Sequence, residues 1–194
     1  MTARDPREAA PAVVTVPLLN HAPEPPPPHR VRALKRHLIQ SLRALRIAKR
    51  PDKLIQTPTP EPEGFTATVL AAGCATCQGH CCAGGGEHAY LDERTMARVR
   101  RDNPGLDARA IIRLYLERVA PLSHRGSCLF HAPTGCTLGR ALRAWLCDAY
   151  YCNGLRVFLK HAPVPGRARI VATRHGQERH SPVLIQTSGQ SGGP

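Results

Sequence analysis

The chain has 194 residues, and its 27 Lys and Arg against 14 Asp and Glu give a formal net charge of +13. Three Phe, four Tyr and one Trp beside nineteen Pro and sixteen Gly exclude a large aromatic core. A core this thin usually needs a further cross-link such as a disulfide or a structural metal. The positive charge favours contact with a polyanion, and it would also offset the negative charge of ionised thiols.

No stretch of the sequence approaches the roughly twenty apolar residues that a membrane span needs. The N-terminus also lacks the apolar run of a secretory signal, because Val13 to Leu19 is short and is broken by Pro17. We therefore predict no transmembrane segment and a cytoplasmic location, where thiols stay reduced.

Residues 1–63 are predicted to form a disordered, Pro-rich N-terminal region that contains one basic amphipathic helix at residues 29–50. Apolar residues recur in this helix at intervals of three and four, at Val31, Leu34, Leu38, Leu42 and Leu45. The leucine face either docks on the cysteine domain, which we favour, or leaves the helix to bind nucleic acid or another polyanion. Residues 23–28 add a polyproline stretch, typical of a stiff spacer.

Residues 64–185 are predicted to form a cysteine-cluster domain, and residues 186–194 a flexible tail. Three helices are expected: one that opens at Asp92 as N-cap and ends before Pro104, then residues 106–119 and residues 140–148. Residues 121–139 look irregular, the glycines after Ala83 look like a flexible loop, and β-like runs at 155–159 and 168–173 flank a turn at 163–166. The predicted fold class is mainly α: a small, cysteine-rich, metal-stabilised domain with irregular loops and a short β-hairpin near the C-terminus.

Eight cysteines lie in two groups of four, headed by the cluster Cys74-x-x-Cys77-x-x-x-Cys81-Cys82. A C-x2-C step lets two sulfurs converge on one ion, which is why it recurs in zinc and iron–sulfur sites. Neighbouring side chains such as those of Cys81 and Cys82 point apart, so two metal sites or a larger cluster fit better than one mononuclear site. We predict that all eight bind zinc or iron, with the two groups of four together in space: Cys74, Cys77, Cys81, Cys82, Cys128, Cys136, Cys147 and Cys152.

Other uses of these residues stay open. The thiols could pair as disulfides, although reduced surroundings disfavour this, and C-x-x-C is also a redox motif. Four histidines near the cysteines are weaker candidate ligands, of which His80 is best placed: His80, His88, His124 and His131.

The spacing C-x2-C-x3-CC, followed by a helix and later cysteines, resembles the YkgJ-type cysteine-cluster proteins, which are described as zinc- or iron-chelating. The similarity covers residues 73–152 and continues in Gly126-Ser-Cys128-Leu-Phe130 and Gly135-Cys136-Thr-Leu138. The third element is Arg143-Ala-Trp-Leu-Cys147-Asp-Ala-Tyr-Tyr-Cys152, which departs from the family at Ala144, Asp148 and Tyr151, where Pro, Arg and Pro are usual. The resemblance implies metal chelation by the matching cysteines.

The leading hypothesis is therefore a metal-binding protein that holds zinc or iron, including an iron–sulfur cluster, through its cysteines. One alternative is an iron–sulfur-dependent enzyme, because the flagellin lysine-N-methylases resemble this cysteine cluster; no catalytic residue can be named, and Gly84-Gly85-Gly86 follows no clear strand that would make it a cofactor loop. Another is a zinc-stabilised adaptor whose basic helix at 29–50 binds a polyanion.

Overall fold

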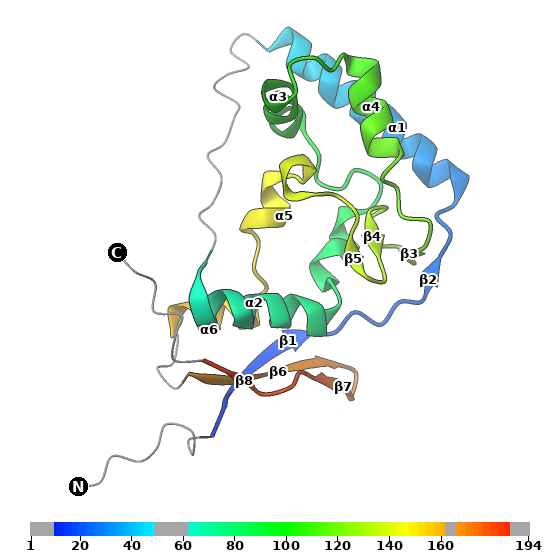
Figure 1. The fold of residues 1–194 in the computed structure, drawn as a ribbon. Coiled ribbons are helices and arrows are strands. Elements are labelled where there is room, and N and C mark those ends of the chain that lie inside the picture. Colours follow the sequence, from blue (N-terminus) through cyan, green and yellow to red (C-terminus); the bar gives the residue numbers. More distant parts are fainter. Residues whose placement is uncertain (1–9, 49–61, 162–165, 187–194) are drawn as a thin grey trace, which may run out of the picture. The chain divides into compact units, whose positions relative to one another are not determined.

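The computed structural model describes residues 10–48, 62–161 and 166–186 (Figure 1). Its contacts divide the chain into two compact units, each assembled from separate stretches. Unit 1 comprises Met1–Asn20, Pro60–His80 and Tyr151–Pro194, and unit 2 comprises His21–Thr59 and Cys81–Tyr150. The units differ from the expected segments 1–63 and 64–185, because each of those segments contributes to both units.

Unit 1 is built on a sheet whose central strand, β6 (Arg167–Arg174), pairs with three others. β1 (Ala12–Pro17) runs parallel to β6, while β7 (Gln177–His180) and β8 (Leu184–Ile185) run antiparallel to it. A β-hairpin lies near the C-terminus as expected, but its strands are β6 and β7, whereas the expected turn at 163–166 would have joined residues 155–159 with 168–173. Its two-residue loop has positive φ at both positions, which is typical of tight hairpin loops. The expectation of disorder over residues 1–29 does not hold for β1, whose backbone is paired along its length.

Two helices, α2 (Gly64–Cys77) and α6 (Asn153–Lys160), lie over the same face of this sheet (Figure 1). Alternate residues of the strands are buried toward them, among them Val14 and Ile170. The prediction of a strand over 155–159 is wrong, because Leu155 and Phe158 bury one side of a helical turn. A short apolar run does not distinguish these two cases without its tertiary partners.

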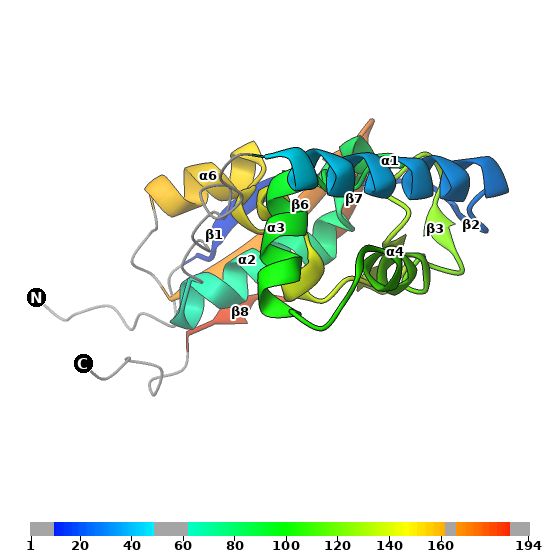
Figure 2. The ribbon, with the colours of Figure 1, turned by 90° about the horizontal axis from the view of Figure 1, so that it is seen from above.

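Unit 2 is built on three helices, α1 (Pro28–Ile47), α3 (Glu93–Asp102) and α4 (Ala108–Leu116). α1 runs past both α3 and α4 (Figures 1 and 2). Its leucine face is buried against their apolar side chains, so the predicted docking of this helix is confirmed within unit 2. The core residues are Leu34, Leu38, Leu42, Leu45, Met96, Val99, Ile111, Tyr115, Leu129 and Phe130.

Both expected helix starts in unit 2 are capped by aspartate. The side chain of Asp92 accepts a hydrogen bond from the backbone N–H of Thr95 at 2.8 Å, and Asp107 accepts one from that of Ala110 at 2.7 Å. Such caps satisfy amides that have no partner inside the helix, which is why Asp is favoured there. The sequence therefore placed the start of α3 correctly, whereas α4 begins at Ala108 and ends at Leu116, inside the expected range 106–119.

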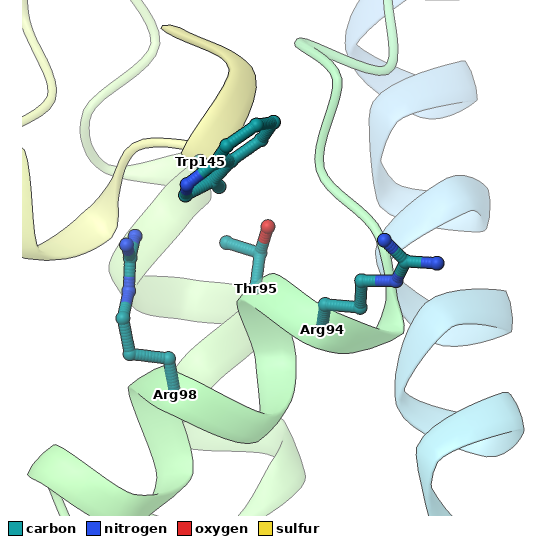
Figure 3. A pocket seen from close by; sticks show the side chains of 4 residues that line it. All are labelled: Arg94, Thr95, Arg98 and Trp145. Atoms are coloured by element: carbon teal, nitrogen blue, oxygen red, sulfur yellow. The ribbon is translucent and has the colours of Figure 1, made fainter. Parts of the chain in front are cut away.

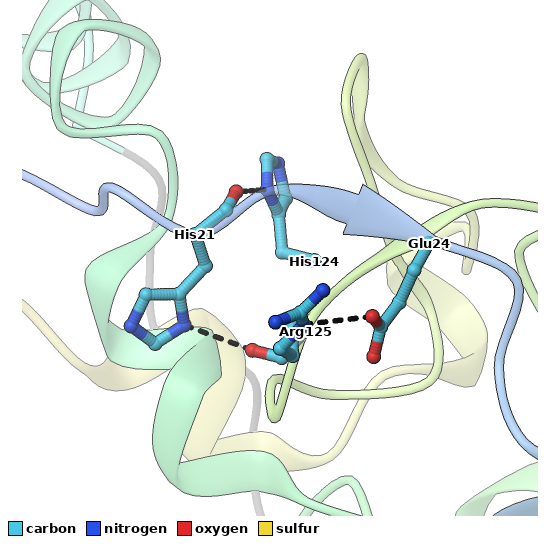
Figure 4. Close-up of polar contacts among 4 residues, drawn as sticks. All are labelled: His21, Glu24, His124 and Arg125. Atoms are coloured by element: carbon cyan, nitrogen blue, oxygen red, sulfur yellow. Dashed lines mark hydrogen bonds and ion pairs between the residues drawn. The ribbon is translucent and has the colours of Figure 1, made fainter.

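The segment before α1 is held to unit 2 by a short antiparallel pairing of β2 (Pro23–Glu24) with β3 (Ser123–His124). The side chain of Arg125 donates to Glu24 at 2.7 Å, and His21 Nδ1 lies 2.8 Å from the carbonyl oxygen of Arg125 (Figure 4). His124 Nδ1 in turn donates to the carbonyl oxygen of His21 at 2.7 Å. The polyproline stretch is therefore anchored at its start, and its last proline begins α1.

The remainder of unit 2 consists of short elements: β4 (His131–Ala132), β5 (Gly135–Cys136), the 3-10 helix η3 (Arg140–Leu142) and α5 (Trp145–Ala149). The helix predicted at 140–148 is divided in two, because Arg143 and Ala144 are extended. The mainly helical fold class is thus confirmed in part, since small sheets accompany the helices. Within the described ranges, no helix combines the length and apolar character needed to cross a membrane.

Candidate metal centre

All eight cysteines lie among the residues that the structure describes. Unit 2 contains five of them and unit 1 contains three, so each predicted group of four is divided between the units. The cysteines of unit 2 form the thiol group considered first: Cys81, Cys82, Cys128, Cys136 and Cys147. They come from three separate parts of the chain, which only tertiary structure can bring together.

The backbone joins two of these parts directly. The N–H of Cys128 donates to the carbonyl oxygen of Cys82 at 3.0 Å, which ties the 3-10 helix η2 (His80–Gly85) to the loop before β4. A Cβ atom built at Gly85 would lie 3.0 Å from Cys128 Cβ and 3.5 Å from its Sγ. Gly85 is therefore buried against Cys128.

The glycines after Ala83 were expected to form a flexible loop, and this is wrong for the first two. Gly84 and Gly85 belong to η2, and any side chain at Gly84 would overlap the hydroxyl of Tyr90. That hydroxyl donates to the carbonyl oxygen of Cys81 at 3.3 Å. Glycine is needed here for close packing around the thiols, a requirement that the sequence alone does not reveal.

Cys136 and Cys147 complete the thiol group from the other side of unit 2. Cys136 lies in β5 opposite His131 of β4, and the N–H of His131 donates to the carbonyl oxygen of Cys128 at 3.0 Å. Cys147 lies in α5. Cys81, Cys136 and Cys147 are exposed, whereas Cys82 and Cys128 are half-buried. Three of the five thiols are thus accessible from solvent.

The two adjacent cysteines of η2 differ in pKa because a hydrogen bond joins their thiols. A hydrogen bond from the Cys82 thiol lowers the pKa of Cys81 from 9.0 to about 7, against the opposing effect of burial. The same hydrogen bond is the main reason that the pKa of Cys82 is raised, and burial and the negative charge of Cys81 raise it further. Cys81 is therefore the thiol of this pair that ionises first, and a thiolate is the form that binds metal.

Two further thiols of the group, those of Cys128 and Cys147, have a raised pKa. Burial raises the pKa of Cys128 to about 12, and the charges of Cys136 and Cys147 add to this. Loss of surrounding water raises the pKa of Cys147 to about 11, and the charges of Cys136, Asp148 and Cys81 act in the same direction. Neighbouring thiolate charges thus raise the pKa of Cys82, Cys128 and Cys147, and a cation among these thiols would lower it.

Two arginines partly offset this mutual repulsion. Arg30 is buried, and its guanidinium donates to Glu87 and to the carbonyl oxygen of Ser127, both at 2.6 Å. Its charge lowers the pKa of Cys128, and that of Arg143 lowers the pKa of Cys147. Sequence analysis missed Arg30, because nothing distinguishes it from the other basic residues of α1.

Unit 1 holds the remaining cysteines, Cys74, Cys77 and Cys152. Cys77 is buried at the end of α2, and its sulfur accepts a hydrogen bond from the backbone N–H of His80 at 3.3 Å. Cys74 is exposed one turn earlier on α2, and Cys152 is the residue before α6. Three thiols are one fewer than a four-thiolate site requires, and His80 is a further donor in the same unit.

The other candidate histidines have neighbours of their own. The ring of His88 lies 5.5 Å from that of Tyr90, and the ring of His124 lies 4.6 Å from that of His131. His131 Nδ1 is 2.9 Å from the hydroxyl of Ser127. Among the residues that the structure describes, no three His, Cys, Asp or Glu side chains are already arranged to hold a metal ion.

Comparison of the chain with protein-family models, with curated proteins and with solved structures finds no match in any of the three.

Proposed function

We propose that the chain binds zinc or iron through its cysteines, with a principal centre formed by the five cysteines of unit 2. The observation that carries this proposal is the gathering of thiols from three parts of the chain into one compact unit, where neighbouring thiolate charges raise the pKa of Cys82, Cys128 and Cys147. Clustered thiolates repel one another, and a divalent cation would convert that repulsion into coordination.

Binding would require the side chains of these cysteines to turn toward a common point. The three exposed thiols, Cys81, Cys136 and Cys147, have room to do so. The backbone hydrogen bond between Cys128 and Cys82, together with the close packing of Gly85, supports the same arrangement by holding the two half-buried thiols near each other. Four of the five suffice for a tetrahedral zinc ion, and a larger iron–sulfur cluster would also take thiolate ligands.

The role that the structure supports best for this metal is structural. The strands that carry or flank the thiols, β4 and β5, are two residues long each, and such short pairings are marginal on their own. A metal that joins η2, β5 and α5 would contribute its binding free energy to folding, on the order of 10 kcal/mol for structural zinc. The resemblance to the YkgJ-type proteins agrees with this proposal but names no reaction.

Whether unit 1 also binds a metal ion depends on how many ions each chain holds. A second ion there would draw on Cys74, Cys77 and Cys152, with His80 as the fourth donor in the unit. The metal content of the pure protein separates these cases, because one equivalent supports a single centre and two equivalents support a centre in each unit.

The test is metal analysis of the full chain purified anaerobically, with two matched variants. Cys136→Ser/Cys147→Ser removes two exposed thiols from unit 2 and leaves three, too few for a four-thiolate site, whereas Cys74→Ser removes an exposed thiol from unit 1. We expect Cys136→Ser/Cys147→Ser to lower the metal content by about one equivalent and Cys74→Ser to leave the unit 2 ion in place. A brown protein containing iron and sulfide indicates a cluster, and a colourless protein containing zinc indicates a tetrahedral site.

Two results contradict the proposal. One is a wild-type chain that remains metal-free after anaerobic incubation with zinc or with ferrous iron and sulfide, with all eight thiols still titratable. The other is a metal content that stays unchanged in the unit 2 variant, because the centre would then not belong to the cysteines of unit 2.

A further inference from the structure

The solvent-exposed side of α1 carries a row of cations, here called the basic row. Its five exposed residues recur at intervals of three, four and seven, so they share an arc of about 100° on the helix: Arg32, Lys35, Arg36, Arg43 and Arg46. From Arg32 to Arg46 the helix rises by about 21 Å. The basic row is therefore straight, and it is long enough to follow an extended partner.

The docking of the leucine face leaves the basic row exposed. Leu34, Leu38 and Leu42 are buried in unit 2, where α3 and α4 lie on the same side of α1 (Figure 2). The sixth cation of the helix, Arg30, is buried and pairs with Glu87 at 2.6 Å. Docking of α1 and binding of a polyanion are therefore compatible, because each uses a different side of the same helix.

The charge of the basic row is not neutralised within the described part of the chain. α1 contains no Asp or Glu, and none of the ion pairs between described residues involves a member of the row. α3 adds the exposed Arg94, whose side chain extends on the side where α1 lies and away from Trp145 (Figure 3). Like charges at this spacing repel one another, and a polyanion would relieve that repulsion.

The composition of this face distinguishes among the possible polyanions. A helix that lies on a membrane inserts its apolar face, but the leucines of α1 are already buried and Ile47 is its only exposed large apolar residue. A protein interface needs an apolar core, which a row of cations does not supply. Single-stranded nucleic acid is held by stacking on aromatic rings, and α1 contains no Phe, Tyr or Trp. A nucleic-acid duplex needs none of these features.

We propose that the basic row of α1 binds the phosphate backbone of double-stranded DNA without reading its base sequence. DNA carries one negative charge per about 1.7 Å of its axis, so a straight row of cations meets phosphates along its whole length. Lys and Arg that contact these phosphates release condensed counterions, which drives binding. The basic row is distinct from the proposed metal centre, since none of its members is a thiol.

The test is the fluorescence anisotropy of a labelled DNA duplex, longer than α1, titrated with the full chain at several concentrations of potassium chloride. Five phosphate contacts predict that the logarithm of the association constant falls against the logarithm of salt concentration with a slope of about −4.5. Arg32→Gln/Arg36→Gln removes two of these contacts. It should bring the slope to about −2.7 and weaken binding at low salt by at least about fivefold.

The matched control is Arg156→Gln/Lys160→Gln, which removes two charges from exposed positions of α6 in unit 1 that have the same spacing. It should leave the slope unchanged. Arg32→Lys/Arg36→Lys keeps both charges of the basic row and should keep the wild-type slope. Because Gln and Lys both favour helices nearly as well as Arg, the circular dichroism of the two α1 variants should match that of the wild type.

The proposal is overturned if the duplex shows no saturable binding at low salt. An equal change of slope in the α1 and α6 variants also overturns it, because DNA would then respond to the net charge of the chain. Single-stranded DNA of the same length that binds as tightly as the duplex excludes a duplex site. Vesicles of phosphatidylcholine and phosphatidylserine that bind more tightly than the duplex, and lose this binding in Arg32→Gln/Arg36→Gln, would assign the basic row to a membrane surface instead.

Discussion

The interactions that stabilise unit 1 differ from those that stabilise unit 2. In unit 1 the longest strand has eight residues, and it pairs with three neighbours under two helices that pack closely on the sheet. At Gly154 the helix backbone approaches so closely that a Cβ would overlap the carbonyl oxygen of Thr15. Unit 2 has a leucine-rich helical half, but its cysteine-bearing half contains strands of only two residues.

This difference explains how a chain poor in large apolar residues can fold. Unit 1 compensates with backbone pairing and close approach, which need small residues and a regular sheet. The cysteine-bearing half of unit 2 has neither long strands nor a continuous apolar surface, and it is here that five thiols gather. A metal is therefore expected to matter for unit 2 and to be dispensable for the sheet of unit 1.

The largest expected effect is that of metal removal. If the proposed metal is bound, a strong chelator should lower the midpoint of thermal unfolding by more than about 10 °C when unfolding is followed by Trp145 fluorescence, because a structural metal contributes its binding free energy to folding. The signal is specific to unit 2, since Trp145 is the only tryptophan. An unchanged midpoint would show that unit 2 depends on metal no more than unit 1 does.

The second perturbation targets unit 1. Gly154→Ala should lower the free energy of unfolding by about 3 kcal/mol, because α6 must move away from β1 to accommodate the new methyl group. The control is Gly139→Ala in unit 2, where no atom lies within 4 Å of the new Cβ and φ is −63°. That variant should change stability by less than about 1 kcal/mol in urea unfolding. Equal effects would show that close packing of α6 on β1 is unimportant.

A smaller effect is expected at the thiol group. In Gly85→Ala the new methyl group would lie 3.0 Å from Cys128 Cβ and 3.4 Å from the ring of Tyr90, so stability should fall by about 1 kcal/mol. Metal affinity, measured by competition with a chromogenic chelator, should fall as well because Cys128 is displaced. Gly105→Ala, which meets no atom within 4 Å, serves as the control and should alter neither quantity.

The smallest expected effect concerns the order in which two thiols react, and its measurement needs no substitution. In metal-free protein at pH 8, Cys81 lies above its pKa of about 7 and is mostly thiolate, whereas Cys128 lies far below its pKa of about 12 and is a thiol. Iodoacetamide should therefore modify Cys81 first, as read by peptide mass mapping. Lowering the pH through 7 should slow the reaction of Cys81, and raising it from 8 to 10 should accelerate that of Cys128. Faster modification of Cys128 than of Cys81 at pH 8 would contradict the lower pKa assigned to Cys81.

The sequence predicted those features that depend on neighbours along the chain. α1 follows from leucines at intervals of three and four, and the start of α3 follows from Asp92 as its cap. The strand at 168–173 is also a local pattern, whereas its pairing with residues 177–180 was not predicted. The prediction that the leucine face of α1 docks was confirmed, because α3 and α4 supply apolar side chains that bury this continuous stripe.

The tertiary structure alone decided how distant segments combine. Residues 12–17, expected to be disordered, form β1 because β6 supplies backbone partners from the other end of the chain. Residues 155–159 form a helix because the sheet buries one side of it. The eight cysteines divide three and five between the units, not four and four, because grouping in space depends on backbone contacts such as that of Cys128 with Cys82. The spacing of the cysteines along the chain predicts metal binding, whereas only the fold determines which thiols lie close enough to bind the same ion.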